Sequence, residues 1–120
     1  MILVDTSVWI DHFRKGNPQL EKLLNDGDVI CHPMIIGELA CGNIKNRNEI
    51  LGLLQSLPSV QQVEQDEILL FIENKKLMGK GLGYIDMHLL VSAILADAFL
   101  WTLDKRLSEI SKGLKVGVSY

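Results

Sequence analysis

Short apolar runs alternate along this chain with longer stretches in which apolar residues recur at helical spacing. Short apolar runs bounded by turn residues are typical of buried strands, whereas the longer periodic stretches are typical of helices. Five segments are predicted as strands: Ile2–Val4, Val29–Cys31, Val60–Val63, Phe99–Leu103 and Leu114–Val118. Seven segments are predicted as helices: Ser7–Arg14, Pro18–Asn25, Pro33–Cys41, Asn48–Leu57, Asp66–Met78, Ile85–Ala96 and Lys105–Ile110.

Prolines and glycines support these boundaries. Pro18 and Pro33 suit the first turn of a helix, and several glycines, such as Gly16 and Gly113, suit helix ends. Because the strands alternate with helices, we expect a mostly parallel sheet covered on both sides. The predicted fold class is therefore α/β, a three-layer α/β/α sandwich with about five strands. A length of 120 residues predicts one domain over 1–120.

Composition narrows the class of protein without naming a function. Hydrophobic residues make up 48% of the chain and charged residues 22%, as in ordinary globular domains. The longest uncharged apolar stretch, 87–96, is far shorter than the ~20 residues of a membrane span. No basic segment of the signal-peptide type precedes Asp5, so the cytoplasm is the expected compartment. Cys31 and Cys41 lack metal-binding spacing, and we expect both to be small buried apolar residues.

The net charge of −3 argues against a broad nucleic-acid-binding surface, which is usually basic. It leaves open an enzyme whose acidic residues are neutralised by divalent cations.

Four acidic residues lie in unusual positions for solvated charges. Asp5 and Asp104 directly follow predicted strands, so both belong to the carboxyl edge of the sheet, where open parallel sheets bind their ligands. Glu38 has only apolar or glycine neighbours at helical spacing, and Asp86 opens a helix that is otherwise almost entirely apolar.

Each acid also has an ordinary structural interpretation. Asp86 and Asp104 could cap the helices that they begin, and Glu38 could form a buried salt bridge. Asp5 could cap the first helix, although Thr6 and Ser7 are available for that role and are the expected caps.

Taken together, the four carboxylates point to a metal site. Like charges in apolar surroundings are costly unless a pKa rises or a cation binds. Oxygen ligands without cysteine or clustered histidine favour Mg²⁺ or Mn²⁺ over zinc. A carboxylate cluster that holds one or two such ions is typical of enzymes that hydrolyse phosphodiesters.

The same residues carry a resemblance to a known family. The segments LVDTSVWID at 3–11, IIGELACG at 35–42, GYIDMHLLVSA at 83–93 and LWTLDKRL at 100–107 resemble, in order, those of PIN-domain ribonucleases. The resemblance spans essentially the whole chain, and it is strongest to the VapC toxins of bacterial and archaeal toxin–antitoxin pairs.

This resemblance implies an endoribonuclease that depends on one or two Mg²⁺ or Mn²⁺ ions and is inhibited by a small cognate VapB-like antitoxin. Its catalytic and metal-binding quartet would be Asp5, Glu38, Asp86 and Asp104. The hydroxyls of Thr6 or Ser7 and of Thr102 would orient carboxylates or a bound water.

The resemblance leaves two further expectations. Some members carry another acid three residues after the fourth, where this chain has Leu107, which puts a complete second metal site in doubt. The family is often homodimeric, and apolar residues around Ile36 and Leu39 would be candidates for a dimer or antitoxin surface.

Other functions fit the pattern less well. A receiver domain needs an acidic pair after the first strand and a lysine at the end of the last, whereas Thr6 follows Asp5 and Lys115 falls at the start of its strand. A haloacid-type phosphatase needs a second aspartate where Ser7 stands, and Ser7 lacks the elbow motif of a serine nucleophile. The alternative that stays open is a catalytically silent PIN-like module that binds RNA or protein.

Overall fold

A parallel sheet of four short strands forms the centre of the molecule. The computed structural model describes residues 1–120, and its strands are β1 (Ile2–Val4), β2 (Val29–Ile30), β3 (Phe99–Trp101) and β4 (Gly117–Val118). Their order across the sheet is β2-β1-β3-β4, and every pairing is parallel. The chain leaves β1 toward β2 on one side and later returns to β3 on the other. The topological switch point therefore lies between the carboxyl ends of β1 and β3.

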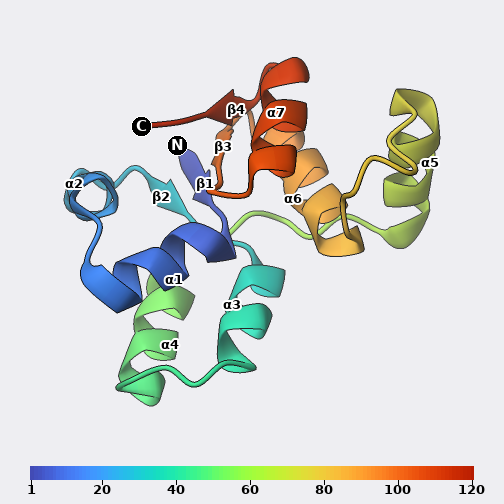
Figure 1. Ribbon diagram of the computed structural model, residues 1–120. Coiled ribbons are helices and arrows are strands. Elements are labelled where there is room, and N and C mark those ends of the chain that lie inside the picture. The colour runs from blue at the N-terminus through green and yellow to red at the C-terminus, as the bar shows by residue number, and fades with distance from the viewer.

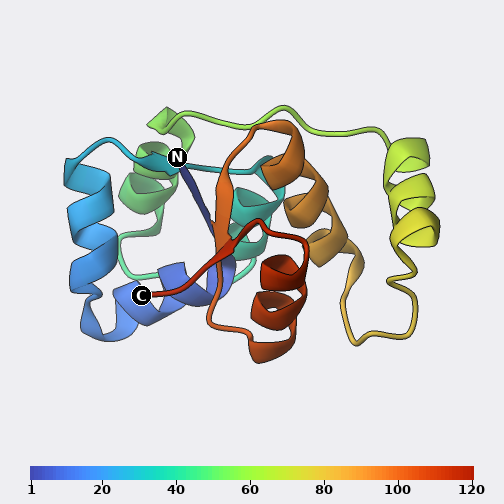
Figure 2. The ribbon, with the colours of Figure 1, turned by 90° about the horizontal axis from the view of Figure 1, so that it is seen from above.

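Seven helices surround this sheet: α1 (Thr6–Lys15), α2 (Pro18–Asn25), α3 (Pro33–Ala40), α4 (Arg47–Ser56), α5 (Gln65–Lys75), α6 (Tyr84–Leu95) and α7 (Lys105–Gly113). In both ribbon views α1 and α2 lie to one side of the strands and α6 and α7 to the other (Figures 1 and 2). The α5 helix lies beyond α6 at the periphery. The predicted α/β class is confirmed, since helices cover a parallel sheet from both sides.

Side chains at the helix starts explain several of these boundaries. Asn17 accepts a hydrogen bond from Leu20 N at the start of α2, and His32 accepts one from Met34 N at the start of α3. Pro18 and Pro33 follow these caps, as the sequence predicted. The middle of α6 is buried from Met87 to Ala93, which makes this helix the centre of the core. None of the helices has the length and hydropathy that spanning a bilayer requires.

The strand predicted at Val60–Val63 does not form. A single parallel bridge joins Cys31 to Ser59, and Val60 N donates to Cys31 O at 3.0 Å. Beyond Val60 the chain leaves the sheet edge and runs extended toward α5, with Gln61 and Gln62 exposed. The sheet therefore has four strands, close to the predicted number, because only the first residues of this segment reach β2.

Two expectations about burial were also wrong. Cys31 is buried but Cys41 is exposed, since α3 ends at Ala40 and leaves the next residue at the surface. Leu39 is 2% exposed and belongs to the core, so it offers no surface to a partner, whereas Ile36 is half-buried.

The contact between β4 and α7 gives a test of the packing. A Cβ atom on Gly117 would lie 2.6 Å from Lys112 N and 2.5 Å from Ser111 Oγ, so Gly117→Ala must push β4 away from α7. We expect this variant to lose about 1–3 kcal/mol of unfolding free energy, measured by urea denaturation. Gly113→Ala is the matched control, because nothing lies within 4 Å of its Cβ position. Equal stability of the two variants would contradict the packing described.

Candidate active site

Asp5 is the best-anchored acid at the carboxyl edge of the sheet. It follows β1, is 7% exposed, and donates its backbone N–H to Trp101 O at 2.9 Å. Its Oδ2 accepts two hydrogen bonds, from Ser7 Oγ at 2.8 Å and from Thr102 Oγ1 at 2.7 Å. No donor of the protein reaches Oδ1. The carboxylate is therefore fixed through one oxygen while the other remains available.

Ser7 and Thr102 form the link between the ends of β1 and β3. Because both hydroxyls donate to Asp5, they are left as acceptors, and each accepts a backbone N–H: Leu103 N donates to Ser7 Oγ at 2.9 Å and Asp104 N donates to Thr102 Oγ1 at 3.0 Å. The expectation that Thr6 or Ser7 caps α1 was wrong. Asp5 occupies the N-cap position, and no side chain closes that helix end.

Asp86 and Asp104 do cap their helices, as their ordinary interpretation predicted. Asp104 Oδ1 accepts from Leu107 N at 2.9 Å, and Asp86 Oδ2 accepts from Gly83 N at 2.9 Å. Each cap uses a single carboxylate oxygen, so Asp104 Oδ2 and Asp86 Oδ1 have no donor in the protein. The capping hydrogen bond therefore holds each carboxylate in place, and its second oxygen remains available to a metal ion.

Glu38 lies in a different environment from the one expected. It is exposed rather than buried among apolar residues, and it forms no salt bridge. Its Oε1 accepts from Thr6 Oγ1 at 2.8 Å, which draws it to the start of α1 beside Asp5. Its Oε2 accepts no hydrogen bond from the protein, so each of the four acids keeps one carboxylate oxygen without a protein donor.

None of the four acids forms an ion pair. The two ion pairs in the molecule join Lys15 to Asp11 and Lys22 to Asp26, and neither involves the quartet. The pKa of Asp86 is raised above its ordinary value, mainly by burial and further by the negative charges of Asp5 and Asp104, while the Gly83 hydrogen bond opposes the shift. Asp5, Asp86 and Asp104 therefore lie close enough to repel one another.

The four acids nevertheless do not converge on one point. No group of three or more His, Cys, Asp or Glu side chains is arranged closely enough to hold a metal ion. The site offers one free oxygen from each of four carboxylates, which is the donor type that Mg²⁺ and Mn²⁺ prefer. The donor set thus fits such an ion, although these side-chain positions do not enclose one.

Two histidines that are distant in sequence meet inside the protein, which the sequence did not indicate. The rings of His32 and His88 lie 6.1 Å apart, and both residues are buried. His32 Nδ1 accepts from Met34 N, so its Nε2 donates to Ser92 Oγ at 3.1 Å. Burial and the proximity of His88 lower the pKa of His32 to about 4, and burial also lowers the pKa of His88. Neither histidine is hydrogen-bonded to Ser7, so Ser7 has no histidine partner.

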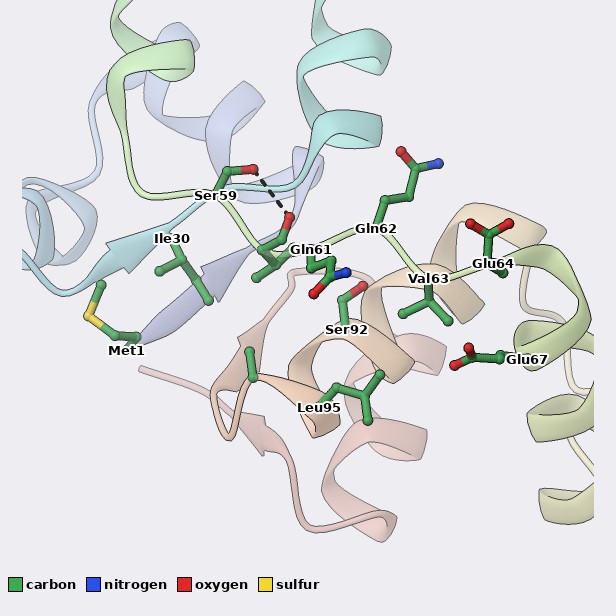
Figure 3. Close-up of a pocket in the computed structure, with 12 residues that line it drawn as sticks. Met1, Ile30, Ser59, Gln61, Gln62, Val63, Glu64, Glu67, Ser92 and Leu95 are labelled. Carbon is green, nitrogen blue, oxygen red and sulfur yellow. Dashed lines mark hydrogen bonds between the residues drawn. The ribbon is translucent and has the colours of Figure 1, made fainter.

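The four acids do not line the cavity that lies between residues 59–64 and α6. This cavity measures about 570 Å³ (Figure 3). The candidate active site is instead an open edge of the sheet, where Glu38 and Asp104 are exposed.

Comparison with known proteins shows the family of this chain. The model of the PIN domain family matches residues 2–113. The chain belongs to the PIN domain family. Within that family it is of the VapC type: it is 49% identical over 108 residues to proteins named Ribonuclease VapC32 from two strains of Mycobacterium tuberculosis, covering 89% of this chain and 87% of each relative.

A solved structure shows the same fold. It is described as the structure of FitAB bound to an IR36 DNA fragment, and it matches with a TM-score of 0.60 over 93% of this chain and 91% of that chain. The sequence identity is 16%, so this likeness concerns the fold alone.

The mutual repulsion of the acids can be measured directly. The carboxyl group of Asp86 should titrate above the ordinary range of aspartates when no divalent ion is present, and Asp5→Asn should lower its pKa because one negative neighbour is removed. NMR titration of the side-chain carboxyl carbon checks both statements. Asp26→Asn, which changes an acid paired with Lys22, is the control and should leave the pKa of Asp86 unchanged. An unchanged pKa in Asp5→Asn would show that the two carboxylates do not interact.

Proposed function

We propose that this protein is a metal-dependent endoribonuclease that hydrolyses RNA phosphodiester bonds. The observation that carries the proposal is that all four carboxylates around the carboxyl ends of β1 and β3 keep one oxygen free of protein donors, and none is paired with a cation. The name of the relatives, ribonuclease, supports RNA as the substrate. The open edge also supports it, since a polymer backbone must be able to approach the acids.

Asp5, Glu38, Asp86 and Asp104 are the proposed ligands of one or two Mg²⁺ or Mn²⁺ ions. Such an ion, when bound, supplies activation of a water molecule and stabilisation of negative charge on the phosphate. The work of this chain is positional: Ser7 and Thr102 fix Asp5, Thr6 fixes Glu38, and the two helix caps fix Asp86 and Asp104. Hydroxyls and amides that orient ligands in this way strongly affect metal affinity.

Leu107 bears on the number of ions. It is fully buried in the core, and its N–H is the donor that fixes Asp104. The position three residues after Asp104 therefore serves packing here and offers no fifth carboxylate.

Removal of single acids tests the proposed chemistry. We expect Asp5→Asn and Asp86→Asn each to lower RNA cleavage at least about 100-fold, because each removes a charged ligand. Cleavage should stop with EDTA and return with Mn²⁺, and Mn²⁺ should raise the melting temperature of the unmodified protein but not of these variants.

Asp66→Asn on the exposed first turn of α5 is the matched control and should retain activity. Cleavage that persists in the Asp5→Asn, Asp86→Asn double variant would reject the proposal. RNA binding with no cleavage by the unmodified protein would instead favour the silent module.

We also propose that the protein acts as the toxin of a toxin–antitoxin pair, as a homodimer bound by a small VapB-like antitoxin. The VapC type of the chain supports this role. Expression of the chain alone in a bacterial host should slow growth, and co-expression of a small protein encoded beside its gene should restore growth and yield a complex. The proposed homodimer would sediment at twice the mass of the 13.4 kDa chain.

The Asp5→Asn, Asp86→Asn double variant separates toxicity from binding. It should be harmless to the host yet still copurify with the antitoxin, since the substitutions keep the size of both side chains. A harmless unmodified chain, or a neighbouring protein that does not bind, would contradict the toxin role.

A further inference from the structure

A second pocket shares two helices with the candidate active site, although none of the four acids lines it. It measures about 370 Å³ and is formed by the N-terminal parts of α3 and α6 and by residues 62–65 at the entry to α5. Met34 lines it one helical turn before Glu38, and Tyr84 and His88 line it on either side of Asp86 in sequence. The two helices that supply Glu38 and Asp86 therefore also supply the walls of this pocket. Its volume is within the range of pockets that hold small ligands.

The polar groups of this pocket suit a base rather than a phosphate. Its lining contains no lysine or arginine, and it includes the carboxylate of Glu64 together with the amides of Gln62 and Gln65. A carboxylate repels phosphate but accepts hydrogen bonds from the amino groups of bases, and amides both donate and accept. Figure 3 shows Gln62 and Glu64 on the same side of the extended segment and Gln61 on the other.

Tyr84 provides an aromatic surface at the mouth of the pocket. It is 42% exposed, and its ring meets the His88 ring at 89° with the centroids 4.7 Å apart. This contact holds the tyrosine in one orientation before any ligand arrives, which reduces the entropy lost on binding. Single-stranded RNA is commonly bound by stacking its bases on such aromatic side chains.

His88 forms the inner wall with unused hydrogen-bonding capacity. It is 2% exposed, its Nδ1 is buried without a partner, and its ring makes no hydrogen bond within the protein. Buried polar groups are usually satisfied, so a histidine of this kind at a pocket wall points to a ligand.

We propose that this pocket takes one unstacked base of the RNA strand next to the scissile phosphate, with Tyr84 stacking on the base and Gln62 and Glu64 contacting its edge. The inference rests on the proposed function, because the scissile phosphate would lie at the metal ions that the quartet binds while the pocket holds the neighbouring base. The pocket would then contribute to the choice of cleavage position.

The test measures binding, so that it does not depend on catalysis. Every variant is made in an Asp5→Asn background, and fluorescence anisotropy gives the affinity for 12-nucleotide uridine, adenosine and cytidine chains and for an abasic phosphodiester chain of equal length. The background protein should bind at least one base-bearing chain about tenfold more tightly than the abasic chain. Tyr84→Ala should reduce that advantage to about twofold or less and leave the abasic affinity unchanged, whereas Tyr84→Phe should keep it.

Neighbouring residues provide matched controls. Gln62→Ala should change the preference among the three base-bearing chains, and Gln61→Ala, on the opposite side of the segment, should not. Tyr120→Ala removes the other tyrosine, which packs on Trp101 outside the pocket, and should also keep the advantage. A Tyr84→Ala variant that binds all chains as before, or that weakens base-bearing and abasic chains equally, would overturn the pocket assignment, as would equal affinity of the background protein for all chains.

The two proposals fail separately. Base-dependent binding that needs Tyr84, in a protein that never cleaves RNA, would reject the nuclease and retain the pocket. Metal-dependent cleavage by a protein whose RNA binding does not depend on the bases or on Tyr84 would retain the nuclease and reject the pocket.

Discussion

The position of the whole site depends on two hydroxyl groups that donate to one carboxylate oxygen. Ser7 and Thr102 are 95 residues apart in sequence, yet both bind Asp5 Oδ2 and lie 3.3 Å from each other. Their acceptor sides take the backbone N–H groups of Leu103 and Asp104, so the loop after β3 is tied to the first turn of α1. This network fixes the geometry of the switch point between β1 and β3, where a parallel sheet offers its ligand site. Without it, the ends of the two strands would share only the sheet hydrogen bonds.

The cost of this arrangement is electrostatic. Three aspartates interact closely enough that Asp5 and Asp104 raise the pKa of Asp86, and no lysine or arginine forms an ion pair with any of them. A fold selected for stability alone would compensate such charges with a cation of its own or replace them with neutral caps. Because the pKa of Asp86 is raised in the folded state, stability falls as the pH rises from the ordinary pKa of an unfolded aspartate to this raised pKa, and it levels off above it. Uncompensated repulsion between charged groups is typical of sites that bind a charged ligand.

The sequence predicted the class of fold and the four acids because both follow from local patterns. Apolar strands ending in Asp5 and Asp104 placed these residues at one edge of the sheet, and the observed order β2-β1-β3-β4 agrees with that placement. The errors arose where tertiary contacts decide. Val60–Val63 was predicted as a strand, but Val60 is its only residue that bonds to Cys31, which follows β2. Glu38 was expected in apolar surroundings because its neighbours along α3 are apolar, yet that side of the helix faces solvent. The pairing of His32 with His88 joins residues 56 positions apart and has no local signal.

The contacts made by Thr6 and Ser7 have a consequence for motion in the site. These residues are adjacent in sequence, but Thr6 binds Glu38 on α3 while Ser7 binds Asp5 after β1. One peptide unit therefore connects the anchors of two acids that belong to different layers of the molecule. Glu38 is held to the start of α1 by this single bond from Thr6, whereas Asp5 is also held from the β3 side by Thr102. Loss of the Thr6 hydroxyl would therefore release Glu38 while leaving both anchors of Asp5 intact.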